Sequence, residues 1–312
     1  MKILVTGGAG FIGSHVVDAY VAAGHEVSVV DNLFTGKVCN LNGVARFYQV
    51  DIASPGLDEV IAFEKPEVIS HQAARVDVRA SMEQPLLFAQ TNVIGSLNLL
   101  EVCRRHGVRK VIYAQTGGCV YGEPIALPSP ESHVIQPIDP YGASKYPMEL
   151  YLKTYAHQFG ITYTVLRYPN VYGPRQDHTG EAGVVSIFSK HMLLSTQAII
   201  NGTGEQLRDY VYVTDVAHAN LLALEQGDNQ IYNVGSGMGT SVNQIFSLLK
   251  EITGYRLEPV FGPLRPGEVS ASYLDSEKAE RELGWKCEVA LAQGLRNTVE
   301  FVRSQLQAEG LL

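Results

Sequence analysis

Cysteine is scarce in this chain, with four residues among 312, and the four lie far apart in the sequence. No two of them form a Cys-x-x-Cys pair, so the sequence predicts neither a disulfide framework nor a zinc site, and we predict no metal site. Thiols that stay unpaired suit a reducing compartment, and we therefore expect a cytoplasmic protein. The four residues are Cys39, Cys103, Cys119 and Cys287.

The sequence also lacks a long apolar run and an excess of positive charge. Nowhere do about 18 apolar residues follow one another, the length needed to cross a bilayer. An apolar run at Ile3–Val5 leaves no room for a charged leader before it. The formal net charge of −8 disfavours nucleic acid as a general partner, because such binders need a cationic surface. We expect no membrane span, no secretory leader and no nucleic-acid partner.

What the chain has in quantity is hydrophobic residues, at 46 %, and 30 glycines. This composition is typical of a globular protein with a substantial core. Short runs rich in Val and Ile alternate with longer segments of helical spacing, which indicates a parallel sheet with helices on both faces. The runs expected as strands are Ile3–Val5, Val27–Val30, Phe47–Val50, Val68–Ser70, Lys110–Ala114, Thr162–Leu166 and Gln230–Val234.

We therefore predict an α/β fold, a Rossmann-type doubly wound parallel sheet with a smaller mixed α/β lobe that binds substrate. The NAD-binding sheet domain takes residues 1–165, and later segments near 211–234 rejoin it. Residues 166–312 form the interleaved substrate lobe, and the proline-rich stretch 122–140 forms an ordered loop or lid. Helices are expected at Phe11–Ala23, Leu86–His106, Tyr141–His157, Val184–Leu194, Val216–Glu225, Val242–Thr253 and Leu291–Gln305.

The first predicted strand runs into a glycine-rich turn, after which a helix begins. Gly7, Gly10 and Gly13 meet three needs of a dinucleotide site: a tight turn, close approach to a pyrophosphate, and packing of the helix on the strand. The second strand ends at Asp31, whose carboxylate can accept a hydrogen bond from the adenosine ribose and repels a 2′-phosphate. The sequence therefore predicts a site for NAD rather than NADP.

The spacing of these glycines resembles that of the extended branch of the short-chain dehydrogenase/reductase superfamily. Three later segments strengthen the resemblance: Asp51-Ile52 after the third strand, His71-Gln72-Ala73-Ala74 after the fourth, and Thr91-Asn92-Val93-Ile94-Gly95. Membership of this superfamily implies a bound NAD. The resemblance implies cofactor contacts from Phe11, Ile12, Asn32, Asp51, Ile52, Gln72, Ala73, Ala74, Asn92 and Tyr168, besides the three glycines and Asp31.

Tyr141 and Lys145 lie four residues apart, on one face of a helix that begins near Pro140. A lysine cation beside a phenol, together with a positive nicotinamide, favours phenolate and lets the tyrosine act as a base near neutral pH. In the superfamily that the chain resembles, this pair also binds the cofactor and works with a nearby Ser or Thr. Thr116 is the nearest hydroxyl here, because Gly117 holds the commoner position. We predict Tyr141, Lys145 and Thr116 as the catalytic residues.

The second half of the chain resembles the UDP-glucose 4-epimerase group, through Leu166–Gln176, Gly202–Val213 and Arg265–Glu268. The resemblance implies a UDP-hexose substrate: Tyr141 removes the 4-hydroxyl proton while C4 passes hydride to NAD, and hydride later returns to the other face. Ser272 falls where relatives carry either a tyrosine or a small residue, and a small residue is implied to admit UDP-GlcNAc and UDP-GalNAc. Substrate contacts are expected from Thr116, Asn170, Arg208, Arg265, Glu268 and Ser272.

Other functions stay open on the sequence. A net oxidoreductase, a dehydratase or a decarboxylase could use the same scaffold, although Gly118 and Cys119 stand where related dehydratases carry an acid pair. Without a carboxylate there, dehydration is disfavoured. A non-catalytic NAD sensor is a further alternative, against which the retention of the three predicted catalytic residues argues.

The resemblance also implies a homodimer through helices Leu86–His106 and Tyr141–His157, whose many apolar residues permit it. Pro147 lies within the second helix, two residues after Lys145, where it lacks the N–H of a helical hydrogen bond. We expect it to bend the helix after the turn that carries the catalytic pair.

Overall fold

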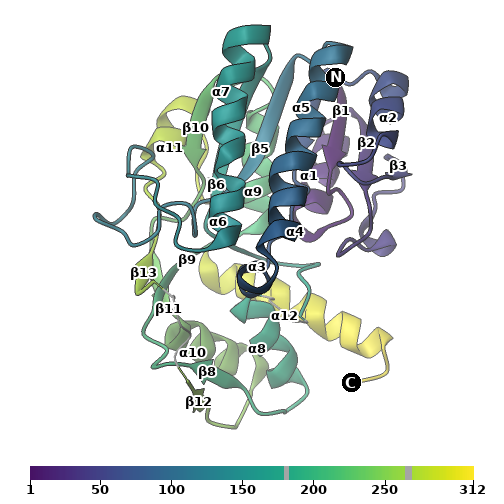
Figure 1. Cartoon of the computed structure of the whole chain (residues 1–312). Coiled ribbons are helices and arrows are strands. Elements are labelled where there is room, and N and C mark those ends of the chain that lie inside the picture. Colours follow the sequence, from purple (N-terminus) through teal and green to yellow (C-terminus); the bar gives the residue numbers. More distant parts are fainter. Residues whose placement is uncertain (179–182, 264–268) are drawn as a thin grey trace.

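Seven parallel strands form the central sheet of the computed structural model, which describes residues 1–178, 183–263 and 269–312. Their order is β10-β6-β5-β4-β1-β2-β3, so the chain reverses direction across the sheet between β1 and β4 (Figure 1). This is the arrangement of a doubly wound nucleotide-binding sheet, and the predicted fold class is confirmed. The strands are β1 Lys2–Thr6, β2 Glu26–Asp31, β3 Arg46–Gln49, β4 Val68–His71, β5 Lys110–Thr116, β6 Thr162–Tyr168 and β10 Gln230–Asn233.

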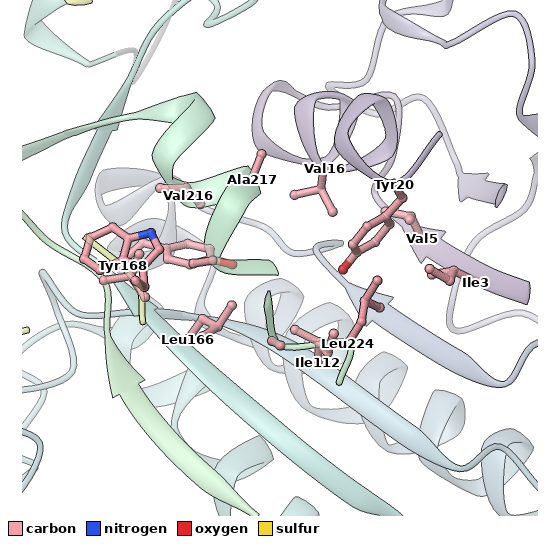
Figure 2. Close-up of a cluster of buried hydrophobic side chains, with 14 of the residues drawn as sticks. Ile3, Val5, Val16, Tyr20, Ile112, Leu166, Tyr168, Val216, Ala217 and Leu224 are labelled. Carbon is pink, nitrogen blue, oxygen red and sulfur yellow. The ribbon is translucent and has the colours of Figure 1, made fainter. Parts of the chain in front are cut away.

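Helices α1 (Phe11–Ala22) and α9 (Val213–Leu222) cover one face of the sheet. We predicted α9 at Val216–Glu225, three residues too late at both ends. No glycine, proline or capping side chain separates it from the strand before it, so the sequence carries no boundary signal there. Figure 2 shows the apolar cluster that these helices make with the sheet, including Ile3, Val5, Val16, Tyr20, Ile112, Leu166, Tyr168, Val216, Ala217 and Leu224.

Helices α2 (Gly56–Glu64), α5 (Ser96–His106) and α7 (Pro147–Phe159) cover the opposite face and share a second apolar cluster with it. The predicted helix Leu86–His106 is present as a continuous run in which α4 (Pro85–Ala89) and a π-helical segment (Gln90–Gly95) lead into α5. Helix α2 is missing from the predicted set, because its nine residues are too few to show a clear helical period.

The run Pro85–His106 is long and apolar enough to cross a membrane by length and composition alone. Of its most apolar 18-residue window, 44 % is buried inside the protein, and Leu99, Leu100 and Val102 pack in the cluster under the sheet. A single helix of this kind is weak evidence for a span, because the core helix of a globular protein passes the same test.

A smaller lobe lies at the carboxyl end of the sheet strands (Figure 1). Its core is built by α8 (Val184–Leu193), α10 (Val242–Thr253) and α12 (Leu291–Ala308), all three at predicted positions. Strand β9 pairs with β7, β11 and β13, and β8 pairs with β12. These strands are β7 Asn170–Tyr172, β8 Ile199–Asn201, β9 Leu207–Tyr212, β11 Gly239–Ser241, β12 Val260–Gly262 and β13 Ala271–Ser272.

The proline-rich stretch 122–139 is an ordered loop, as predicted, and it is tied to the segment that follows β13. Ser129 N donates to the carbonyl of Tyr273 at 2.9 Å, and Asp275 N donates to the carbonyl of Ser129 at 2.9 Å. The next helix is broken: α6 (Pro140–Lys145) ends before α7 begins at Pro147. Tyr146 between them keeps helical backbone angles, φ −65° and ψ −38°, so the structure shows an interruption of hydrogen bonding at this proline and the expected bend stays a prediction. The remaining helices are the 3-10 turn Val38–Asn40, α3 Val78–Glu83 and α11 Glu277–Leu283.

Candidate active site

The turn between β1 and α1 and the first turn of the helix hold two glycines, Gly7 and Gly13, where there is no room for a side chain. A Cβ on Gly13 would lie 2.1 Å from the carbonyl oxygen of Gly7, and one on Gly7, which has φ +71°, would lie 2.6 Å from Ala73 N. A Cβ on Gly10 would meet only the Gly7 carbonyl, at 3.1 Å. The helix therefore packs tightly on the strand, while the backbone around Gly10 stays open at the N-terminus of α1, where free N–H groups favour an anion.

Asp31 at the end of β2 is held by the backbone on both sides. Its Oδ2 accepts from Ala9 N at 3.0 Å and its Oδ1 accepts from Leu33 N at 2.8 Å. Beside it, Asn32 Nδ2 donates to Asp51 Oδ2 at 2.7 Å. Two strand ends thereby present a fixed set of polar groups to the same space.

These groups line a cavity of about 490 Å³ along the carboxyl edge of the sheet. The residues fit a dinucleotide, because Gln72 Oε1 is buried with no hydrogen-bond partner in the described chain and the glycine turn leaves its outer side open. The residues predicted for the cofactor that line this cavity are Gly7, Gly10, Phe11, Ile12, Gly13, Asp31, Asn32, Asp51, Ile52, Gln72, Ala73 and Ala74.

Asn92 and Tyr168 are placed differently from the others. Asn92 does not line this cavity; its Oδ1 accepts from Arg75 N at 2.8 Å, and its Nδ2 donates to Ser144 Oγ at 2.9 Å. It therefore ties the loop after β4 to the helix that carries Tyr141. Tyr168 lines a second, adjoining cavity, and its hydroxyl accepts from Asn220 Nδ2 at 2.8 Å.

Two residues that the sequence analysis missed also line the 490 Å³ cavity. The guanidinium of Arg75 lies over the ring of Phe34, 3.9 Å from its centroid. Both lie just after strand-end motifs, Phe34 two residues after Asp31-Asn32 and Arg75 directly after Ala74. Because the carboxyl ends of parallel strands meet at one edge, this position was the available signal for them.

The second cavity is larger, about 800 Å³, and lies between the sheet edge and the smaller lobe. Phe11, Ile12, Gln72 and Ala74 line both cavities, so the two spaces adjoin. The structure brings the three residues predicted as catalytic together in the wall of the larger one: Thr116, Tyr141 and Lys145.

Local structure fixes these three residues. Helix α6 places Tyr141 and Lys145 one turn apart, and Thr116 ends β5 beside them. Thr116 Oγ1 accepts from Cys119 N at 3.1 Å, and the Thr116 side chain lies near enough to Tyr141 to lower the pKa of that phenol against the larger effect of burial. A Cβ on Gly142 would lie 2.9 Å from the carbonyl oxygen of Cys119, so this glycine lets α6 approach the end of β5.

Burial dominates the electrostatics of Tyr141 and Lys145. It raises the pKa of Tyr141, and the nearby Thr116 side chain lowers that pKa only in part. Burial also lowers the pKa of Lys145 to about 7, against a raising effect of Glu149, and Lys145 Nζ lies 4.3 Å from the ring centroid of Tyr113. The expected lowering of the tyrosine pKa depends on the positive nicotinamide as well as on Lys145, and it stays a prediction. Phenolate at neutral pH needs a further positive charge in the cavity.

Asp139 is a second finding that the sequence analysis missed. It is the single carboxylate among the described residues that line the larger cavity, and burial raises its pKa. Its Oδ1 accepts from Gly142 N at 2.7 Å and so caps α6. Burial also raises the pKa of the neighbouring Cys119 to about 12, which keeps that thiol protonated. An Asp directly before a proline at the first helical position was the available signal.

The predicted substrate residues are only partly brought together. Asn170 on β7 and Arg208 on β9 line the larger cavity. Ser272 pairs in register with Arg208 across β13 and β9, but it is absent from the described lining of that cavity. Arg265 and Glu268 lie outside the described residues.

Comparison with known proteins gives concordant matches along the chain. The profile of the NAD dependent epimerase/dehydratase family matches residues 3–235. A Methanocaldococcus jannaschii protein named putative UDP-glucose 4-epimerase is 49 % identical over 302 residues, with 97 % of this chain and 98 % of the relative covered.

Two solved structures are similar over nearly their whole length. A UDP-glucose 4-epimerase from Thermotoga maritima with UDP-glucose has 53 % identity and a TM-score of 0.97, with 98 % of this chain and 100 % of that chain covered. A UDP-N-acetylglucosamine 4-epimerase from Methanobrevibacter ruminantium in complex with UDP-N-acetylmuramic acid has 34 % identity and a TM-score of 0.92, with 97 % and 98 % covered. The glycine turn, the Tyr141–Lys145 helix and these matches agree: the chain belongs to the NAD-dependent epimerase/dehydratase family.

Proposed function

We propose that this enzyme interconverts UDP-glucose and UDP-galactose by inverting C4 of the hexose. One observation carries the proposal: Thr116, Tyr141 and Lys145 share a cavity wall with Phe11 and Ile12, which also line the dinucleotide cavity. A sugar carbon in that space can face the base and the cofactor together. The relatives named as UDP-glucose 4-epimerases support this choice of reaction.

The chain's residues supply proton transfer and positioning. Bound beside Phe11 and Ile12, NAD would supply a reversible hydride acceptor for C4 and a positively charged nicotinamide in the cavity. Tyr141 accepts the proton of the 4-hydroxyl during oxidation and gives it back during reduction. Thr116, which shares the cavity wall with Tyr141, orients that hydroxyl. When Lys145 is protonated, its positive charge favours the phenolate form of Tyr141. The sugar therefore undergoes no net oxidation or reduction.

The two ends of the larger cavity suit different tasks. Arg208 and Asn170 come from the smaller lobe, where a guanidinium can hold a diphosphate through two oxygens. Near Tyr141 the wall includes Gly118 and Cys119, which are small. We propose that the nucleotide end is held firmly while the 4-keto sugar turns beside these small residues, so binding energy is placed away from the reacting ring.

Asp139 bears on the dehydratase alternative. A dehydratase needs a carboxylic acid free to protonate the departing hydroxyl. One oxygen of Asp139 is already engaged at the N-terminus of α6, and the positions after Thr116 carry no carboxylate. Epimerisation is therefore the better supported reaction.

A panel of UDP-hexoses, followed by NMR of the anomeric and C4 protons, tests the proposed reaction. We expect UDP-glucose and UDP-galactose to approach one equilibrium mixture from either side, without added NAD and without accumulation of NADH. A released keto sugar, or NADH formed in proportion to sugar consumed, would show a net oxidoreductase instead.

We also propose that the enzyme accepts UDP-GlcNAc and UDP-GalNAc, because Ser272 is small and is paired in register with Arg208, which lines the larger cavity. The similarity to a UDP-N-acetylglucosamine 4-epimerase supports this breadth. Ser272→Tyr should lower kcat/KM for UDP-GlcNAc by about 100-fold, the size of a steric exclusion of roughly 3 kcal/mol, and change that for UDP-glucose by less than about threefold. Turnover assays with both sugars measure the ratio of the two kcat/KM values in the wild type and in the variant. Equal loss for both substrates would contradict a role in selectivity.

A homodimer through the helical run Pro85–His106 and α7 is part of the proposal. Both carry exposed apolar side chains, among them Leu86, Ile94, Leu150 and Phe159. Leu150→Asp should shift the protein towards monomer in sedimentation velocity, because burying an unpaired carboxylate is unfavourable. Phe261→Asp is the matched control, since Phe261 is similarly exposed but lies on β12 of the smaller lobe. A wild-type monomer at micromolar concentration would refute the dimer.

Location in the cytoplasm also belongs to the proposal. All four cysteines are free thiols in the structure, including the exposed Cys39. An exposed free thiol is suited to a reducing compartment. Fractionation of cells that express the tagged protein would test this location.

A further inference from the structure

The helix that carries Tyr141 and Lys145 loses its regular hydrogen bonding directly after Lys145. Pro147 has no N–H to donate to the carbonyl of Ala143, and Glu149 N donates to the carbonyl of Tyr146 at 3.0 Å, three residues back rather than four. The carbonyl of Lys145 is thereby freed from its usual helical donor. A buried carbonyl in this state needs a partner from elsewhere in the protein.

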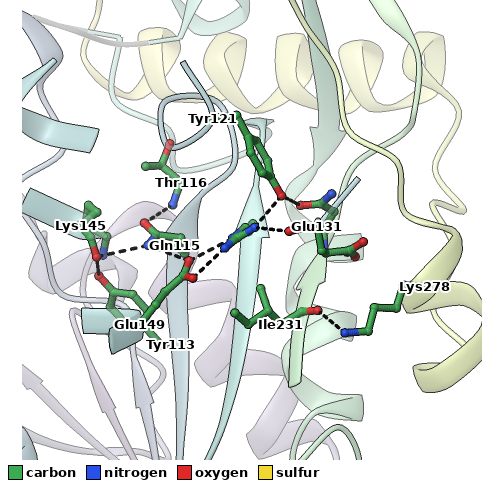
Figure 3. A network of polar contacts seen from close by, with 11 residues as sticks. Tyr113, Gln115, Thr116, Tyr121, Glu131, Lys145, Glu149, Ile231 and Lys278 are labelled. Carbon is green, nitrogen blue, oxygen red and sulfur yellow. Dashed lines mark hydrogen bonds and ion pairs between the residues drawn. The ribbon is translucent and has the colours of Figure 1, made fainter. Parts of the chain in front are cut away.

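Two buried side chains of β5 supply that partner. Tyr113 OH donates to the Lys145 carbonyl at 3.0 Å, and Gln115 Nε2 donates to it at 3.2 Å (Figure 3). Both side chains are almost fully buried, with exposures of 0 % for Tyr113 and 2 % for Gln115. The break at Pro147 therefore joins the end of α6 to the strand that ends in Thr116.

Gln115 makes two further bonds that give its amide one orientation. Its Oε1 accepts from Thr116 N at 2.9 Å, and its Nε2 also donates to Glu149 Oε1 at 3.0 Å. A flipped amide would set its oxygen against the carboxylate and the carbonyl and its NH₂ against an N–H, so all three bonds would be lost. Figure 3 shows the side chain between Thr116, Lys145 and Glu149.

The carboxylate that Gln115 contacts is itself fixed. Arg167 donates to both oxygens of Glu149, from Nε at 3.0 Å and from a terminal nitrogen at 2.7 Å, and both side chains are buried. Arg167 also donates to Tyr121 OH at 2.8 Å. A buried, fully bonded pair of this kind holds its position closely. The Gln115 amide is therefore hydrogen-bonded to a carboxylate whose own position is fixed.

We infer that Gln115 is a positioning residue for the proposed reaction: through one amide it sets Thr116 of β5 against Lys145 of α6, on either side of Tyr141. The inference rests on the proposed function. The backbones of two residues that must act together are held by the same side chain, and a displacement of about 1 Å in such a set is enough to slow chemistry strongly.

Gln115→Leu removes the three hydrogen bonds and keeps the side chain's approximate size. We expect kcat for UDP-glucose to fall about tenfold with KM changed less than about twofold, because alignment is lost and binding is not. Gln115→Met, which is unbranched, is measured in parallel in case the leucine variant folds poorly. Gln197→Leu is the control, since Gln197 bonds two backbone carbonyls in the smaller lobe.

The pH profile separates positioning from general destabilisation. Burial raises the pKa of Tyr141 and the nearby Thr116 side chain partly offsets this, so loosening Thr116 raises that pKa further. A base must be deprotonated to act, and the rising limb of kcat against pH should therefore move to higher pH by about half a unit in Gln115→Leu. The Gln197→Leu profile should stay with the wild type. An unshifted profile in both Gln115 variants would overturn the inference.

Pro147→Ala tests the route through the Lys145 carbonyl. An alanine restores a backbone N–H and lets Glu149 N return to that carbonyl, so Gln115→Leu should then lower kcat only about threefold. If Gln115→Leu lowers kcat tenfold both in the wild-type chain and in the Pro147→Ala variant, the connection through the Lys145 carbonyl is wrong. Phenolate absorbance of the protein, referenced to Tyr141→Phe, reports the Tyr141 titration without turnover. If the wild-type protein fails to epimerise any UDP-hexose but Gln115→Leu still raises the pKa of Tyr141 in this titration, the proposed reaction fails and the positioning inference stands.

Discussion

Tyr141→Phe is expected to abolish epimerisation and to leave the folded, NAD-containing protein intact. The substitution removes one oxygen, the group that we propose accepts the proton of the 4-hydroxyl. Loss of a positioned general base lowers rates by about 10²–10⁴-fold, and the same oxygen serves both half-reactions here, so we expect the upper end of that range. The ring keeps its edge-on contact with Phe88, at 6.5 Å between centroids, so packing is preserved.

Tyr146→Phe is the matched control for this prediction. Tyr146 lies five residues later at the junction of α6 and α7 and has no place in the cavity lining that the structure describes. Its variant should retain activity within about twofold, because a partly buried hydroxyl away from the cavity contributes only to stability. Turnover of UDP-glucose and the NAD released on denaturation are measured for both proteins. Activity above a tenth of wild type in Tyr141→Phe would refute the assigned base.

Gly13→Ala is expected to remove the cofactor. The added methyl would lie 2.1 Å from the carbonyl oxygen of Gly7, and backbone cannot yield as a flexible side chain can. Helix α1 must shift away from β1, which carries the N–H groups at its start out of position. We expect NAD content in the purified protein to fall below about a tenth and activity to fall at least 100-fold, a loss of roughly 3 kcal/mol in binding.

Gly43→Ala controls for the loss of a glycine as such. A Cβ on Gly43 would meet no atom within 4 Å, so this variant should keep its NAD and its activity. NAD content is read from the absorbance of the denatured supernatant, and the melting temperature is recorded with and without added NAD. If Gly13→Ala retains a full complement of NAD, the account of the turn is wrong.

Much of the sheet could be predicted because its strands are buried on both faces. Such strands read as short continuous apolar runs, and Ile3–Val5 and Val68–Ser70 are examples that the sequence shows plainly. The smaller lobe is harder. Strand β9 pairs with three strands from before and after it in the chain, and such non-local pairings leave no pattern in any one segment.

The residues of the candidate site also differ in whether the sequence indicates them. Gly13, Asp31 and Tyr141 belong to spaced patterns with a chemical reason, so the sequence indicates them. Gln115 acts through three hydrogen bonds, two of them to residues of another segment, and nothing around a lone Gln in the sequence indicates them. Asp139 is indicated only as a helix cap by the proline after it, and the sequence does not show that it lines the cavity. The burial of Tyr141, which raises its pKa, is likewise not visible in the sequence, whereas the neighbouring Lys145 is.

The central claim is that the hydrogen transferred as hydride from C4 returns to C4 of the same sugar without exchanging with water. UDP-glucose labelled with deuterium at C4 tests it most directly, with incubation in ordinary water and NMR and mass analysis of the UDP-galactose formed. We predict that the product keeps nearly all of its deuterium at C4. Deuterium lost to solvent, with hydrogen in its place, would show that the bond is remade from water and would contradict the claim.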